Sequence, residues 1–388
     1  MKIDPKIYLV LDNCFAIKRW VRPLIWMEAA KELGFKYVSA STDNEIDPLF
    51  STDEYMDEWF REVQTASEKT GIIVPTMYTG YQTYRTVGLA HFYEDMAHHL
   101  KENWVCKLID RAAAAGIKGL GFCFFAFSEE VMQSADEYAR MEDRCLSIMA
   151  EIGDFAYERD FQVGMEQMYV PYQTPFTIAQ SEDYLRRIYT MNGGHPIYIT
   201  LDTGHMIGQY LYQKPSKDEI LKSFERDEPG FWLGTDNCMS LWFKYKESGD
   251  FINGTEAILA DIESNPRMFA AEEDTDEYTW IKRLAKYSPI IHMQQTDGII
   301  AGHRSFTPGN NKTGIIKGEP FFKAIQESYD DPDEIFTPVD EIYLDFELFF
   351  ANIAYPHDIL SQLKQSLQHW RQFVPEDGMR LSEIVSRL

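Results

Sequence analysis

The stretch Ser288–Gly309, SPIIHMQQTDGIIAGHRSFTPG, runs from an apolar segment directly into side chains that favour metals and anions. Ile290 and Ile291 are typical of a buried strand. Because side chains alternate along a strand, His292 and Gln294 are expected to point the same way, towards whatever lies at the strand's end. This pattern is typical of a strand and loop that form an active site. A core histidine followed by an exposed loop is the alternative, and the rest of the chain decides between them.

Short apolar segments alternate with helical segments along most of the chain, and this rhythm predicts βα units around a parallel sheet. The expected strands are Ile7–Leu11, Tyr37–Ala40, Ile72–Met77, Gly119–Phe125, Gln162–Met168, Ile197–Asp202, Ile290–Gln294 and Ile342–Leu348. The expected helices include Pro23–Leu33, Ala90–Ala115, Asp136–Arg159, Ile178–Thr190 and Ile359–Phe373. Eight strands in this order predict an α/β fold, a (β/α)8 TIM barrel, whose chemistry lies at the carboxyl-terminal ends of the strands.

The segment between the sixth and seventh strands is much longer than a barrel helix requires. We therefore expect residues 1–388 to form a single TIM-barrel domain with a long insertion after strand six, at residues 207–275. An insertion after a strand's carboxyl-terminal end lies on the catalytic face. A lid or an oligomerisation segment is one interpretation, and an extra helical subdomain with a structural role is the other.

Composition narrows the classes of function. The 388 residues are 45% hydrophobic, which allows a large core, and 37 basic against 62 acidic residues give a net charge of −25. Such a charge repels a phosphate backbone, so a small-molecule partner is favoured over nucleic acid. No apolar run approaches the roughly 18 residues that cross a bilayer, and the N-terminus lacks a signal pattern. Five scattered cysteines are typical of a reducing compartment, so we expect a cytoplasmic protein without a membrane partner.

Four expected strand ends carry groups that could perform chemistry. Glu166 emerges near the end of the fifth strand, Asp202 closes the sixth, and the seventh offers His292. Glu347 lies among apolar neighbours on the eighth. A buried carboxylate without a partner is costly, and a divalent cation among the four residues would remove that cost. Three oxygen donors and one imidazole suit Mn²⁺, Mg²⁺, Co²⁺ or Zn²⁺. For Glu166 a structural salt bridge is the alternative. For Asp345 a structural role is favoured, although it shares a strand face with Glu347 and is the reserve ligand.

These motifs resemble the sugar isomerases and epimerases of the xylose isomerase-like TIM-barrel superfamily. The resemblance rests on Glu166, LDTGH at 201–205, HMQQTD at 292–297 with HRSFTPG at 303–309, and Glu347. The segments NCFAIKRW and YSPIIHMQQTDG look most like epimerases and isomerases of erythrulose phosphate. The resemblance implies that Glu166, Asp202, His292 and Glu347 bind one divalent metal ion, with Mn²⁺ as the first choice. It also implies that Glu166 and Glu347 are the catalytic acid and base.

Four further polar residues are expected to bind the substrate. The resemblance implies this role for His205 and Arg304, although His205 could instead orient a metal ligand. Gln294 shares the strand face of His292, and His303 belongs to the loop that is expected to fold back over the same pocket. Arg304 would contact an anion or a hydroxyl group. Other candidates for a phosphate contact are Lys18, Arg19 and Lys312.

The expected reaction is isomerisation or epimerisation of a ketose or short ketose phosphate, of EC 5.1.3 or 5.3.1 type. Moving a proton beside a carbonyl requires a base and stabilisation of the charge on oxygen, here through a metal-stabilised enediolate. One alternative is a metal-dependent dehydratase of a keto-sugar or cyclitol, which would use the same groups. Another is a metal-free glycoside hydrolase that uses Glu166 and Glu347. The expected partners are a sugar or sugar phosphate and further copies of the chain in a homo-oligomer.

Overall fold

The computed structural model of the protein describes residues 3–80, 83, 85–205, 208–299 and 301–388. Within these residues, eight parallel strands follow one another around a barrel, which the pairing of β1 with β2 closes. The strands are β1 (Lys6–Asp12), β2 (Tyr37–Ser41), β3 (Thr76–Thr79), β4 (Gly119–Phe122), β5 (Gln162–Glu166), β6 (Tyr198–Asp202), β7 (Ile290–His292) and β8 (Glu341–Phe346). A short ninth strand, β9 (Met379–Arg380), lies antiparallel to β1. The predicted (β/α)8 TIM barrel is confirmed.

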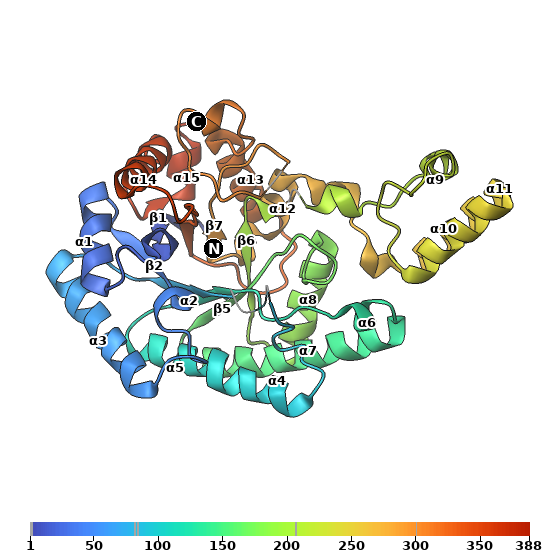
Figure 1. Ribbon diagram of the computed structural model, residues 1–388. Coiled ribbons are helices and arrows are strands. Elements are labelled where there is room, and N and C mark those ends of the chain that lie inside the picture. The colour runs from blue at the N-terminus through green and yellow to red at the C-terminus, as the bar shows by residue number, and fades with distance from the viewer. Residues whose placement is uncertain (1–2, 81–82, 84, 206–207, 300) are drawn as a thin grey trace.

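Helices surround the barrel as an outer layer (Figure 1). They are α1 (Pro23–Leu33), α2 (Thr42–Glu45), α3 (Asp53–Thr70), α4 (Glu94–Leu100), α5 (Lys107–Ala114), α6 (Glu129–Met132), α7 (Ala135–Tyr157), α8 (Ile178–Met191), α12 (Glu277–Leu284), α13 (Gly318–Asp330), α14 (Pro356–Trp370) and α15 (Leu381–Val385). Their apolar faces and the outward side chains of the strands form one continuous core. This core holds each strand in register and therefore fixes the height of every strand end.

Several predicted boundaries differ from the structure by a few residues, and the two largest differences are at the third strand and at the long helix after it. The third strand begins at Thr76 rather than Ile72, because Pro75 has no amide hydrogen for the sheet and Ile73 makes only an isolated bridge to Tyr37. The predicted helix Ala90–Ala115 begins at Glu94, and a π-helical turn, Lys101–Cys106, separates its two α-helical parts. Both differences lie away from the strand ends that carry the candidate site.

Inward-facing side chains fill the barrel in layers. Tyr8, Val10 and Tyr343 form a small cluster apart from the main core, with Tyr37 packed against it. The Tyr8 ring stacks on Tyr343 and meets Tyr37 edge to face, both at 5.1 Å between ring centroids. These tyrosines fill the amino-terminal end of the barrel. Every second residue of a strand points into the barrel. The inward-facing residues two and four positions after these tyrosines therefore bring polar side chains to the carboxyl-terminal end.

Between β6 and β7 the chain forms helices α9 (Lys217–Ser223), α10 (Asp236–Ser248) and α11 (Phe251–Ser264), which project away from the ring in Figure 1. Phe224 holds this arm together, because its ring stacks on both Trp242 and Phe251 at 5.8 and 5.0 Å. Residue 207, the predicted start of the insertion, lies outside the described residues. Its assignment as a lid or an oligomerisation segment stays a prediction.

Two expectations from composition can be compared with the structure. Across the described parts of the chain, no helix has both the length and the apolar character needed to pass through a bilayer. All five cysteines are buried with free thiols, in keeping with the absence of a disulfide pattern in the sequence.

Candidate metal centre

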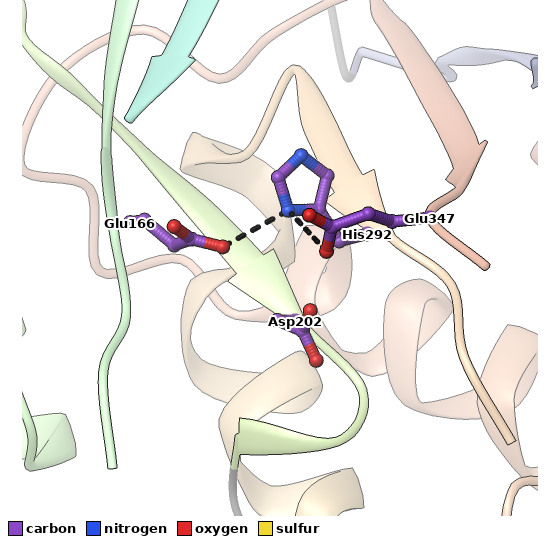
Figure 2. A group of neighbouring side chains, drawn as sticks. All are labelled: Glu166, Asp202, His292 and Glu347. Atoms are coloured by element: carbon purple, nitrogen blue, oxygen red, sulfur yellow. Dashed lines mark hydrogen bonds and ion pairs between the residues drawn. The ribbon is translucent and has the colours of Figure 1, made fainter. Parts of the chain in front are cut away.

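Four side chains converge at the carboxyl-terminal end of the barrel (Figure 2). Glu166, Asp202 and His292 are the last residues of β5, β6 and β7, and Glu347 follows β8 directly. Each offers one ligand atom, and these atoms all lie within 4.8 Å of one another. None of the four residues is more than 2% exposed. The structure therefore brings together the four residues that the sequence predicted as metal ligands.

The donor atoms in this group fit a divalent cation. Glu166 Oε2, Asp202 Oδ2 and Glu347 Oε2 are buried without a hydrogen-bond partner among the residues that the structure describes. The Nδ1 atom of His292 lies 3.0 Å from Glu166 Oε1 and 3.5 Å from Glu347 Oε2. Buried acceptors left in this state are costly unless a cation or a proton joins them. Carboxylate oxygens and one imidazole are suitable ligands for a first-row divalent ion or Mg²⁺.

The orientation of Asp202 is fixed by the motif that follows it. Its Oδ1 atom accepts hydrogen bonds from the backbone amides of Gly204 (2.6 Å) and His205 (3.1 Å). It also accepts one from the side-chain amide of Gln294 (2.8 Å). These three hydrogen bonds hold Oδ1 in place and leave the other oxygen, Oδ2, directed towards the other three candidate ligands. The sequence LDTGH thus presents a single, directed carboxylate oxygen.

Charges within the group compensate one another. Burial alone would lower the pKa of His292, but the charges of Glu347 and Glu166 outweigh it and raise this pKa well above its ordinary value. For Glu347, burial works in the opposite direction, and attraction to His292 and His303 holds the pKa at about 2. In the metal-free protein, the positive charge of the protonated His292 therefore offsets the negative charge of the neighbouring carboxylates. A metal ion that binds there would replace this proton.

Two further inward-facing groups lie near the centre, and the first of them was not assigned to it from the sequence. Asp12, at the end of β1, is fully buried, and burial together with the charges of Asp345 and Glu347 raises its pKa. Tyr78 places its ring edge to face against His292 at 5.1 Å. The alternation Tyr8, Val10, Asp12 was the available signal for the first, because it predicts that all three point into the barrel. Asp345 pairs with His292 in the strand register and does not join the group of four.

His205 and His303 line the centre. His205 is buried, and its Nδ1 lies 2.8 Å from the carbonyl oxygen of Gln167, so we assign the ring proton to Nδ1. Its Nε2 then lies 3.9 Å from Asp202 Oδ2. The Nδ1 of His303 is 3.3 Å from Glu347 Oε2. Burial lowers the pKa of His303, but the negative charge of Glu347 outweighs this effect and raises the pKa to about 9. Both imidazoles are placed beside carboxylates of the centre.

Gln294 and Arg304 have protein partners in this structure. Gln294 is fully buried and engaged by Asp202 and the backbone amide of His303. The guanidinium of Arg304 forms an ion pair with Asp297 at 2.7 Å. Among the other phosphate candidates, Arg19 donates to the carbonyl oxygens of Ala351, Asn352 and Ala354, which ties the loop after β1 to the loop after β8. Their predicted contacts with substrate stay predictions.

Comparison with known proteins identifies the family to which the chain belongs. The model of a family described as xylose isomerase-like TIM barrel matches residues 27–338. The chain belongs to this family. Among curated proteins, D-erythrulose 1-phosphate 3-epimerase of Brucella abortus (strain 2308) is 40% identical over 70 residues. That alignment covers 18% of this chain and 23% of the relative, so the chain matches less than a quarter of that enzyme's length.

Solved structures with the same barrel come from several organisms. A protein of Rhodospirillum rubrum ATCC 11170 assigned as a xylose isomerase is 16% identical with a TM-score of 0.66, covering 94% of this chain and 99% of its own. D-psicose 3-epimerase of Clostridium cellulolyticum H10 is 12% identical (TM-score 0.54, covering 94% and 98%). The 3-keto-D-glucoside 4-epimerase of E. coli is 14% identical (TM-score 0.52, covering 95% and 100%). At these identities the likeness establishes the fold, and with the family model it confirms the predicted superfamily.

Proposed function

We propose that this xylose isomerase-like barrel is a divalent-metal-dependent isomerase or epimerase that acts on a ketose or short ketose phosphate. The observation that carries the proposal is the meeting of three buried carboxylates and one imidazole at the catalytic end of the barrel. The names of the relatives support the substrate class, because they include epimerases of D-psicose and of D-erythrulose 1-phosphate. Mn²⁺ is the proposed ion.

Glu166, Asp202, His292 and Glu347 would hold the ion. When bound, a divalent cation supplies Lewis-acid stabilisation of the negative charge that develops on the oxygens of the substrate. The protein contributes the shape of the site, because the three donors on Asp202 Oδ1 and the short contact between His292 and Glu166 restrict how these side chains turn.

Glu166 and Glu347 are the proposed proton carriers. They reach the centre from β5 and from the end of β8, and Figure 2 shows both carboxylates in contact with Nδ1 of His292. One carboxylate removes the proton from the carbon beside the carbonyl, which leaves a planar enediolate. The other glutamate, in its protonated carboxylic acid form, donates a proton to the opposite face, and the product is an epimer. Return of the proton to the neighbouring carbon gives isomerisation instead.

His205 is the proposed contact for a substrate oxygen. Its Nδ1 is engaged by the carbonyl of Gln167, which fixes the ring and leaves Nε2 to accept a hydrogen bond from a hydroxyl group. The ring of Tyr169 packs against it at 4.8 Å and restricts its rotation. Preorganised groups of this kind orient the reacting carbon without having to move during the reaction.

The decisive experiment measures the metal content of the purified protein and of a His292→Ala variant, then tests the Mn²⁺-loaded protein on ketoses and their phosphates by NMR. We expect close to one bound ion in the wild type, loss of that ion in the variant, and a product of unchanged mass. A product that has lost water would identify a dehydratase. Turnover that survives a chelator would instead favour a glycoside hydrolase and would refute the proposal.

A further inference from the structure

We infer that Gln294 is a positioning residue that joins the proposed metal ligand Asp202 to the loop that carries His303. The metal half of this inference rests on the proposed function, whereas the loop half stands on the structure of the protein alone. Substrate contact was the role expected for Gln294 from the sequence. Its surroundings in the folded chain give it a different one.

The side-chain amide of Gln294 is engaged at both ends. Its Nε2 donates to Asp202 Oδ1 at 2.8 Å and also lies 3.3 Å from His303 Nδ1. Its Oε1 accepts the backbone amide of His303 at 2.7 Å. Because Gln294 is fully buried, these protein groups satisfy its amide in place of water. One planar amide therefore sets the distance between the end of β6 and the loop after β7.

Gln294 differs in kind from the other two donors to Asp202. The amides of Gly204 and His205 belong to the same turn as Asp202 and move with it. Gln294 belongs to the chain after β7 and is anchored separately, because Thr203 Oγ1 bonds to both its backbone amide and its carbonyl at 2.9 and 2.8 Å. It alone among these three donors ties the Asp202 carboxylate to another segment.

The loop end of this connection is held in an unfavourable backbone conformation. His303 is one of the few non-glycine residues in the described chain with a positive φ, at 44°. Left-handed geometry costs energy in a residue with a Cβ, so neighbouring contacts must maintain it. The Gln294 amide supplies one such contact, and stacking of the His303 ring on Phe349 at 4.0 Å supplies another. His303 is thereby kept beside Glu347.

The close approach of Gly204 keeps the amide in place. A Cβ at this residue would lie 2.2 Å from the Gln294 side-chain carbon, so any larger residue would displace the amide. Gln295 offers a matched comparison, because it is also buried and bonds to Asn311 and to both backbone groups of Ile316. A Cβ at Gly314 would lie 2.1 Å from its side-chain carbon. Gln295 has the same packing as Gln294 but is directed away from the metal centre.

The test compares Gln294→Met with Gln295→Met, using Mn²⁺ alone in calorimetry and hydrogen exchange of the His303 backbone amide in the metal-free protein. Loss of a group that orients a metal ligand typically weakens metal binding about 10- to 100-fold, and we expect this for Gln294→Met only. Loss of one hydrogen bond should speed exchange at His303 about fivefold. Equal effects of the two substitutions in both measurements would overturn the inference, since a general packing role is common to both residues.

A second pair of variants covers the case in which Gln294→Met fails to fold. Gly204→Ala keeps every polar atom but forces the Gln294 amide away, and Gly314→Ala does the same to Gln295. Weaker Mn²⁺ binding and faster His303 exchange in the first variant only would support the inference. A wild-type protein that takes up no Mn²⁺ would refute the proposed function. In that event unchanged His303 exchange in Gly204→Ala would separately refute the connection.

Discussion

Replacing Glu347 by Gln should separate proton removal from epimerisation. Glu166 Oε1 and Glu347 Oε2 lie 3.0 and 3.5 Å from the same imidazole nitrogen. Under the proposed function, each of these carboxylates serves one face of a planar intermediate. A positioned general base contributes about 10²–10⁴ in rate, which is roughly 2.7–5.5 kcal/mol of activation free energy. Net conversion should fall by that factor in Glu347→Gln. The base on the other face remains, so one of the two epimers should still exchange its proton with solvent.

The assay follows deuterium incorporation from D₂O by NMR, starting separately from each epimer, with Mn²⁺ saturating and the bound metal measured in every sample. Glu166→Gln should show the opposite pattern and exchange the other epimer. Asp345→Asn is the control, since this carboxylate is buried below the centre but does not belong to the group of four. Wild-type turnover in either glutamine variant, with metal bound, would refute the acid and base roles. Exchange of the same epimer in both variants would refute the two-face geometry.

Two further predictions concern stability. Gly164→Ala should lower the unfolding free energy by about 1–3 kcal/mol, because the new Cβ would lie 2.5 Å from Thr200 Oγ1. A urea titration measures this loss. Gly309→Ala is the control and should leave the stability unchanged, because the nearest contact of its new Cβ would be at 3.8 Å. Glu45 is predicted to destabilise the fold at alkaline pH, because burial, only partly offset by its hydrogen bond from Trp59, raises its pKa from 4.5 to about 8. Between these two pKa values the folded state holds a proton that the unfolded state releases. The unfolding free energy contributed by this proton is fully present below pH 4.5 and is lost as the pH rises through 8. The loss is about 1.4 kcal/mol for each pKa unit of the shift. Thermal unfolding of Glu45→Gln should lack this loss, and parallel pH profiles for variant and wild type would contradict the assignment.

The sequence was most informative where local chemistry and periodicity agreed. Glu166 and Asp202 each end an apolar run, and a carboxylate at that place needs a partner, so the centre could be located without coordinates. The eight strands were recognisable for the same reason, since buried parallel strands are almost wholly apolar. The predictions that were wrong concerned the boundaries of single elements. The proline before β3 delays the start of that strand, and nothing in the sequence marks the π-helical turn of Lys101–Cys106.

Side-chain partnerships over long sequence distances could not be predicted. Gln294 bonds to Asp202, which is 92 residues away, and this pairing depends on the heights of two strands and on the space left by Gly204. The ion pair of Arg304 with Asp297 depends in the same way on how a glycine-rich loop folds back. A strand pattern predicts which face a residue occupies, but the identity of its partner follows only from the assembled barrel.

The tyrosines at the amino-terminal end of the barrel have a kinetic consequence. Tyr8, Tyr37 and Tyr343 pack against one another there, which leaves the carboxyl-terminal mouth as the route to the four buried ligands. Under the proposed function, a sugar that contacts the bound ion through this one entrance would lie between the ion and the solvent. We therefore expect the ion to load first and leave last. Turnover should therefore follow compulsory-order kinetics, and bound substrate should slow the escape of the metal.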